Sequence, residues 1–122
     1  MAIKVLAIDD SETMLSMIKQ TLEMGGYGVV VAKDGKDGIA KFKENEVQLI
    51  ITDINMPVMD GITFIKELRK INADIPILTL TTESEDAMKQ KGFEAGANGW
   101  IVKPFRPAQF LDIVKQILSS DG

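Results

Sequence analysis

Cysteine and histidine are both absent from the 122 residues of this sequence. Without cysteine, the chain can form no disulfide bond, zinc thiolate or thiol nucleophile. Without histidine, it lacks the usual general base, the commonest metal ligand and a phosphohistidine of its own. Oxygen atoms are therefore the metal ligands to be expected in this chain.

The sequence also lacks a run of basic residues and a long hydrophobic run. Its 14 Lys and Arg residues are scattered among 18 Asp and Glu residues, and the net charge is −4. Nucleic-acid binding needs a clustered basic face, so we expect no nucleic-acid partner. The apolar run within residues 1–8 is too short for a signal peptide, and no segment is long enough to span a membrane. We expect a cytoplasmic protein without a membrane partner, folded as one domain over residues 1–122.

Apolar runs and helical patterns alternate along the chain, which predicts the α/β class. Strands are expected at residues 3–8, 29–32, 49–52, 77–81 and 99–102. Helices are expected between Ser11 and Gly25, after Asp34-Gly35, at residues 61–70 and 84–95, and from Pro107 onward. Strand followed by helix, repeated, predicts parallel strands joined by right-handed crossovers. The nearly continuous apolar strands favour a doubly wound sheet with helices on both faces.

Two of these helices differ in their apolar residues. The helix at 61–70 is expected to turn Ile62, Ile65 and Leu68 toward the sheet. The helix at 84–95 has a weaker pattern, and its apolar face is expected to be mostly Ala87, Met88 and Ala95. The first of the two helices is therefore the better defined.

The stretch from residue 49 to residue 61 is the one around which the chain is organised. Asp53 ends a buried run of β-branched residues, and Pro57 and Asp60-Gly61 then force a turn. Ligands of open α/β sheets bind at the carboxyl ends of the strands, which makes Asp53 the first candidate for a functional residue. The alternative is that Asp53 only caps its loop, as Asp often does after a strand.

Other polar residues also follow predicted strands. Asp9 and Asp10 follow the first strand, Thr81 ends the fourth and Lys103 follows the fifth, so all should meet Asp53 at one edge of a parallel sheet. Three carboxylates repel one another unless a cation joins them, and an all-oxygen site suits Mg²⁺. The set predicts phosphoryl transfer onto a carboxylate. Taken singly, the acidic pair could just stabilise a helix N-terminus, and Thr81 and Lys103 could be ordinary strand-end residues.

The sequence resembles response-regulator receiver domains, and most of all the single-domain chemotaxis regulators. The matching motifs are Asp9-Asp10, Asp53 to Gly61, Thr81 and Lys103-Pro104-Phe105, spread over the whole chain. The resemblance implies a flavodoxin-like (βα)5 fold with strand order 2-1-3-4-5. It also implies a cis Lys103–Pro104 peptide bond.

The resemblance implies a role for each matching residue. Asp53 would be the phosphoacceptor, and Thr81 and Lys103 would bind the phosphoryl group. Asp10, Asp53 and the Asn55 main-chain carbonyl would ligate Mg²⁺, and Asp9 would act mainly through a water. Trp100 falls at the position of an aromatic switch residue, which is usually a smaller Tyr or Phe. Thr82 stands where a small residue is usual, and it could narrow access to the phosphoryl group.

The partners are also implied by the resemblance. A sensor histidine kinase would donate the phosphoryl group to a monomeric signalling protein that is not an enzyme in the usual sense. A target protein, first of all the flagellar motor switch, would bind the face made by the fourth helix, the fifth strand and the fifth helix.

Other functions remain open alternatives at this point. A single-domain receiver could instead serve in a phosphorelay or as a phosphate sink. A haloacid-dehalogenase-type aspartyl phosphatase wants a second Asp two residues after the first, where this chain has Asn55. An FMN-binding flavodoxin needs a phosphate-cradling loop after the first strand, where Asp9 and Asp10 would repel a phosphate.

Overall fold

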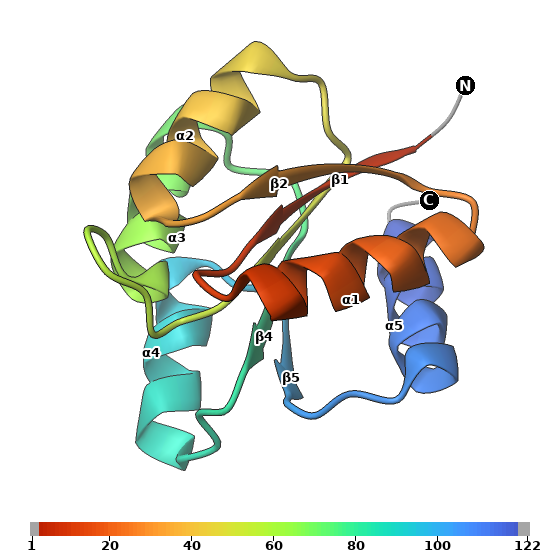
Figure 1. Ribbon diagram of the computed structural model, residues 1–122. Coiled ribbons are helices and arrows are strands. Elements are labelled where there is room, and N and C mark those ends of the chain that lie inside the picture. The colour runs from red at the N-terminus through yellow and green to blue at the C-terminus, as the bar shows by residue number, and fades with distance from the viewer. Residues whose placement is uncertain (1–2, 120–122) are drawn as a thin grey trace.

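The computed structural model describes residues 3–119, so the ends of the expected domain, residues 1–2 and 120–122, lie outside the described residues. Five parallel strands form one sheet (Figure 1). In spatial order they are β2 (Gly28–Ala32), β1 (Lys4–Ile8), β3 (Leu49–Thr52), β4 (Ile77–Thr81) and β5 (Gly99–Val102). The predicted order 2-1-3-4-5 and the α/β class are confirmed.

Helices cover both faces of the sheet (Figure 1). One face carries α1 (Glu12–Met24) and α5 (Pro107–Ser119), and the other carries α2 (Gly35–Glu44), α3 (Gly61–Ile71) and α4 (Asp86–Ala95). Alternate residues of the central strands enter two separate apolar clusters, one on each face. The strands β3 and β4 are buried along their whole length, whereas the edge strands β2 and β5 are only partly covered.

Short polar side chains begin three of the helices. Ser11 accepts a hydrogen bond from the Met14 amide, and Asp34 and Asp60 do the same for α2 and α3. Helix α4 begins at Asp86, two residues later than expected, and its N-cap residue Glu85 makes no side-chain capping bond.

The buried faces of α3 and α4 correct two expectations. Phe64, which the pattern did not single out, is fully buried in α3 with Ile65 and Leu68, while the expected Ile62 is partly buried and packs against the same cluster. In α4 the predicted Ala87 is exposed, and the buried residue is Gly92. A side chain at position 92 would meet the Trp100 ring, so the indole occupies the space that larger helix residues would fill.

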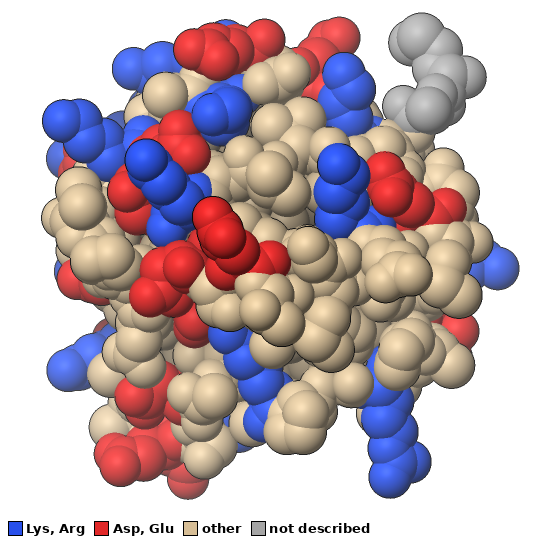
Figure 2. Space-filling model, in the orientation of Figure 1, with Lys and Arg blue, Asp and Glu red and all other residues tan. Residues whose placement is uncertain are grey.

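Charges of both signs are interspersed on the face of the molecule shown in Figure 2. Within residues 3–119, no helix combines the length and the apolar content needed to cross a membrane.

Candidate functional site

Asp53 lies where the central strand β3 ends. Its amide donates to the Ile8 carbonyl, which continues the pairing of β3 with β1 for one more residue. Its side chain is held at the base of the following loop, since Oδ1 accepts a hydrogen bond from the Ile54 amide at 2.6 Å. Asp53 is only 7% exposed, so this carboxylate sits in a depression of the sheet edge rather than on an open loop.

Asp9 and Asp10 extend the neighbouring strand β1 at the same edge. Asp9 is 1% exposed, and its Oδ1 accepts a hydrogen bond from the Ser11 amide at 2.9 Å. Asp10 is exposed. One carboxylate oxygen from each of Asp9, Asp10 and Asp53 lies within 4.8 Å of the others. These three residues are named the acidic cluster below.

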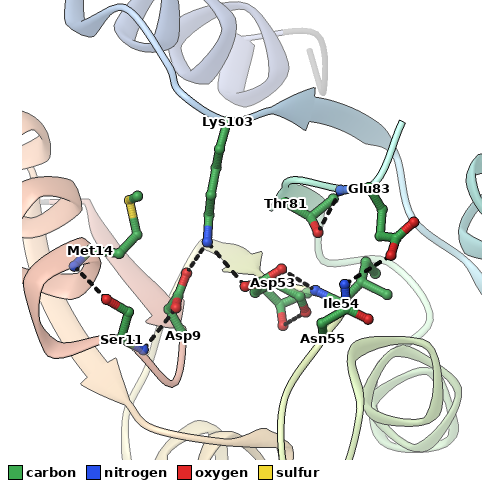
Figure 3. Close-up of polar contacts among 10 residues, drawn as sticks. Asp9, Ser11, Met14, Asp53, Ile54, Asn55, Thr81, Glu83 and Lys103 are labelled. Carbon is green, nitrogen blue, oxygen red and sulfur yellow. Dashed lines mark hydrogen bonds and ion pairs between the residues drawn. The ribbon is translucent and has the colours of Figure 1, made fainter. Parts of the chain in front are cut away.

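Lys103 reaches the acidic cluster from the loop between β5 and α5 (Figure 3). Its Nζ lies 2.7 Å from Asp9 Oδ2 and 3.0 Å from Asp53 Oδ2, and its side chain is 10% exposed. The backbone is fixed there by a bond from the Lys103 amide to the Thr81 carbonyl, and the Lys103–Pro104 peptide is cis, as expected. The sequence distance of 94 residues between Lys103 and Asp9 is closed by the parallel topology.

Burial and charge act against each other in this cluster. Burial raises the pKa of the Asp9 carboxyl above its usual 3.8, although the Lys103 hydrogen bond opposes the shift. Burial alone would lower the pKa of Lys103, but its hydrogen bonds to Asp9 and Asp53 outweigh it and raise that pKa. A single ammonium therefore leaves the acidic cluster with an excess of negative charge that a cation would relieve.

The donor set of the acidic cluster fits Mg²⁺. All of its side-chain ligands are carboxylate oxygens, which hard divalent cations prefer, and their mutual distances allow one ion to contact more than one of them. Exposure of Asp10 and burial of Asp9 give the site one open side and one closed side. The role of the Asn55 main-chain carbonyl remains a prediction.

Thr81 lies across the site from Lys103, at the end of β4 (Figure 3). It is fully buried, and its hydroxyl accepts a hydrogen bond from the Glu83 amide at 3.3 Å. The adjacent Thr82 is exposed. Thr81 is thus tied to the β4–α4 loop rather than to Asp53.

Trp100 is connected to the same loop from the far side. Its indole Nε1 donates to the Glu83 main-chain carbonyl at 2.9 Å, and a Cβ built on Gly92 would lie 2.5 Å from its Cζ3. The ring is half-buried and lies 6.4 Å from the ring of Phe93. The indole is therefore seated on α4 and linked to Thr81 through one intervening residue.

Glu83 is the residue that sequence reasoning missed. Its amide bonds to Thr81, its carbonyl to Trp100, and its carboxylate accepts a bond from the Asn55 side chain at 3.0 Å. The loops that follow β3 and β4 are joined by this last contact (Figure 3). The only sequence signal for a role of Glu83 was its place two residues after Thr81, because hydrogen bonds of main-chain atoms do not depend on residue type.

The family model of the response regulator receiver domain matches residues 5–115. The chain belongs to the receiver-domain family of two-component systems. Members of this family are signalling phosphoacceptors that bind Mg²⁺ at an acidic pocket and interact with histidine kinases and downstream targets.

Relatives of this chain carry the receiver fold both alone and as part of longer proteins. It is 37% identical over 120 residues to the chemotaxis protein CheY of Bacillus subtilis, covering 98% of this chain and 100% of that protein. The crystallised chemotaxis protein CheY4 of Vibrio cholerae is 42% identical, with a TM-score of 0.92 and coverage of 96% of this chain and 99% of that one. The alkaline phosphatase synthesis transcriptional regulatory protein PhoP of B. subtilis is 37% identical over 94% of this chain, which spans only 48% of PhoP. The chain thus spans about half the length of several curated relatives that it matches.

Proposed function

We propose that this chain is a phosphorylation-activated response regulator that accepts a phosphoryl group on Asp53. The observation that carries the proposal is the acidic cluster itself, with carboxylate oxygens within 4.8 Å of one another and Lys103 Nζ bridging Asp9 and Asp53. Asp53 is favoured as acceptor because it directly follows the central strand β3. The donor would be a phosphohistidine of a sensor histidine kinase, since this chain has no histidine.

In the transfer, an oxygen of Asp53 would form the new bond to phosphorus while the bond from phosphorus to the donor imidazole breaks. The imidazole nitrogen keeps that electron pair and takes up a proton. Lys103 Nζ, already 3.0 Å from Asp53 Oδ2, would pair with an oxygen of the incoming group. Asp10, Asp53 and the Asn55 carbonyl would hold Mg²⁺, with Asp9 acting through a water. When bound, the ion would offset the negative charge of the carboxylates and of the phosphoryl group.

The bonds around Glu83 suggest how phosphorylation would change the surface. If the Thr81 hydroxyl turns to donate to a phosphoryl oxygen, the bond that it accepts from the Glu83 amide is weakened. The Glu83 carbonyl, which holds the Trp100 indole, would move with that loop. The face made by α4, β5 and α5 would then change and bind a target protein.

We further propose that this target is the flagellar motor switch and that the protein works in chemotaxis as a cytoplasmic monomer. The support is the similarity, over nearly their full lengths, to chemotaxis proteins of two bacteria. A role in a phosphorelay or as a phosphate sink remains the alternative, because longer transcriptional regulators carry a similar domain.

Incubation with acetyl phosphate and Mg²⁺, followed by intact mass measurement, tests phosphorylation directly. We expect one phosphoryl group on the wild-type chain and none on Asp53→Asn. Asp60→Asn is the matched control, because it neutralises an exposed carboxylate of the same loop and keeps an oxygen that can cap α3. An unmodified wild-type chain, or a label that persists in Asp53→Asn, would refute the proposal.

Beryllofluoride with Mg²⁺ tests the proposed switch without a kinase. Trp100 is the single tryptophan of the chain, so its emission reports one site. If the indole moves inward and buries more apolar area, emission shifts to the blue, and Thr81→Ala suppresses the shift. An unchanged spectrum in a sample shown to bind beryllofluoride would mean that Trp100 is not the moving part.

A further inference from the structure

A groove between α2 and α3 takes no part in the proposed phosphorylation site. Its volume is about 490 Å³. The floor is apolar and consists of Ile39 and Ala40 of α2, Ile71 at the end of α3 and Met59 of the loop between β3 and α3. Ile71 is 46% exposed, although it is a large apolar residue on a helix whose other apolar side chains point inward.

The rim of this groove is positively charged. Lys36 and Lys43 of α2 and Lys70 of α3 line it, and Glu67 is the one carboxylate among its lining residues. Glu67 is paired with Lys70 at 2.9 Å, whereas within residues 3–119 neither Lys36 nor Lys43 forms a salt bridge. Figure 2 shows blue side chains at the upper left, over α2 and α3, with red side chains among them. The chain as a whole carries a net charge of −4, so this rim has the opposite sign to the molecule.

The spacing of the rim residues specifies the shape of a partner. Lys36 and Lys43 are seven residues apart on α2, so they lie on one side of the helix, about 10 Å apart along its axis. Ile39 and Ala40 lie between them on that side, at the i+3 and i+4 positions. A partner helix with two acidic residues about two turns apart and apolar residues between them would match both the charges and the floor.

We propose that the groove between α2 and α3 docks an acidic amphipathic helix of a partner protein. Helices that lay an apolar face into a groove are a recurrent mode of peptide recognition. Charge complementarity selects an acidic helix, because the two unpaired lysines flank the apolar floor. This surface lies on different helices from the face of α4, β5 and α5, so it is a second docking surface.

One end of the groove is nevertheless built by the loop that follows Asp53. A Cβ at Gly35, the first residue of α2, would lie 2.8 Å from the Met59 main-chain oxygen, so the loop and the helix are in close contact. Val58, the residue before Met59, has a φ of 70°, which is uncommon for a β-branched residue. The position of Met59 in the groove therefore depends on the backbone of this loop.

Docking can be tested by NMR with the full ¹⁵N-labelled chain and a designed helical peptide. The peptide carries Glu at two positions seven residues apart and Leu at the third and fourth positions after the first Glu. A matched peptide has Lys in place of both Glu residues. We expect amide shift changes in α2, in the last turn of α3 and at Met59 with the Glu peptide only, and an affinity that falls several-fold between about 0.1 M and 1 M salt.

Matched variants separate the groove from general charge and hydrophobicity. The pair Lys36→Glu and Lys43→Glu should weaken binding about tenfold or more, whereas Lys19→Glu with Lys115→Glu, which changes the net charge equally on α1 and α5, should not. Ile71→Ser should also weaken binding, whereas Met24→Ser, at a residue of α1 that is 76% exposed, should not. Absence of shift changes, changes that map to α4 and β5, or equal binding of both peptides would overturn the proposal.

Other occupants of the groove give distinct results. A dimer in sedimentation velocity that Ile71→Ser abolishes would assign the groove to a second copy of the chain. Binding to vesicles of phosphatidylcholine and phosphatidylserine that requires Lys36 and Lys43, with no response to the Glu peptide, would assign it to an anionic lipid surface. Either result would overturn docking of an acidic helix.

Discussion

Helices α3 and α4 lie side by side on one face of the sheet, yet they are held there by different means. Helix α3 buries Phe64, Ile65 and Leu68, and its first turn is capped by Asp60, whose Oδ1 accepts a bond from the Thr63 amide. Helix α4 buries only Gly92 and has no side-chain capping bond at its N-terminus. The first helix follows the strand of Asp53, and the second follows the strand of Thr81.

The difference indicates which of the two helices can move. Segments with few buried apolar contacts open at lower free-energy cost than the core. At its C-terminal end, α4 is fixed by Arg69 of α3, whose Nη2 donates to the Gly96 carbonyl at 2.7 Å. Before its N-terminal end, the loop that leads into α4 is held by the hydrogen bond from the Trp100 indole to the Glu83 carbonyl. A rearrangement of that loop can therefore displace the start of α4 while α3 keeps the Asp53 loop in place.

The largest expected difference between α3 and α4 is in the loss of stability when one core-facing apolar residue of each helix is truncated. Phe64→Ala should lower the free energy of unfolding by about 3–5 kcal/mol, because Phe64 is fully buried and leaves a cavity. Met88→Ala in α4 should cost less than about 2 kcal/mol, since Met88 is only half-buried. Urea unfolding with fitted midpoints and slopes measures both values. Equal losses would mean that α4 is anchored as firmly as α3.

Alanine at the buried glycine of each of these two helices, Gly61 in α3 and Gly92 in α4, should give the next largest effect. At Gly61 a Cβ would meet the main-chain oxygen of Asp53 and, at 2.7 Å, the Ile54 Cα, neither of which can rotate away. We expect Gly61→Ala to destabilise the protein by about 1–3 kcal/mol. At Gly92 the obstacle is the Trp100 ring, which can turn, and alanine favours the helix by about 1 kcal/mol, so the net loss should be smaller.

Fluorescence distinguishes the two glycine variants independently of stability. Gly92→Ala should displace the indole toward water and shift Trp100 emission to the red, whereas Gly61→Ala should leave the emission maximum unchanged. A red shift of equal size in both variants would contradict a specific contact between the Trp100 ring and Gly92 of α4.

The meeting of Asp9, Asp53 and Lys103 could be predicted because it follows from local patterns, whereas the order of the strands was implied only by the resemblance to receiver domains. A change from continuous apolar runs to helical spacing marks each unit, and parallel strands bring their carboxyl ends to one edge. The importance of Glu83 could not be predicted, since two of its three bonds use main-chain atoms whose direction depends on the loop path.

The sequence pattern correctly placed Met88 and Ala95 of α4 against the core, but it did not reveal the buried position 92, for a related reason. At this position the neighbour is the Trp100 ring of β5, so the buried residue is the smallest one, Gly92, and not the most apolar one. A hydrophobic pattern identifies residues that contribute apolar area themselves. It does not identify those that make room for a side chain from elsewhere in the chain.

Burial of the Asp9 carboxyl affects stability at the carboxyl ends of the strands, where both helices start, and its pH dependence distinguishes it from the anchoring of the helices. Burial raises the pKa of Asp9 above its unfolded value near 3.8, so the folded state binds more protons than the unfolded state between these two pKa values. Charged Asp9 therefore costs stability at neutral pH, and this cost is relieved as the pH falls toward 3.8. The effect should be smaller than that of the core and glycine substitutions.

The difference between wild type and Asp9→Asn isolates this contribution. In EDTA, the stability of Asp9→Asn relative to wild type should be highest near neutral pH and should decline as the pH falls. Asp112→Asn on the exposed side of α5 is the control for removing one carboxylate far from the acidic cluster. A difference that is independent of pH would contradict the raised pKa of Asp9.

The smallest expected effect concerns the N-caps of the two helices. It tests whether the N-terminus of α4 is weakly held because it has no side-chain capping bond. Glu85 occupies the N-cap position with an extended backbone, but it makes no side-chain capping bond. Asp is a preferred N-cap residue, so Glu85→Asp keeps the charge and should stabilise the protein by about 0.5 kcal/mol. Asp60→Ala should remove the cap of α3 and cost about 1 kcal/mol. In Glu85→Asp, hydrogen exchange of the first amides of α4 should become slower, and exchange in α3 should not change. If exchange in α4 also stays the same, the weak attachment of its N-terminus has a cause other than the missing cap.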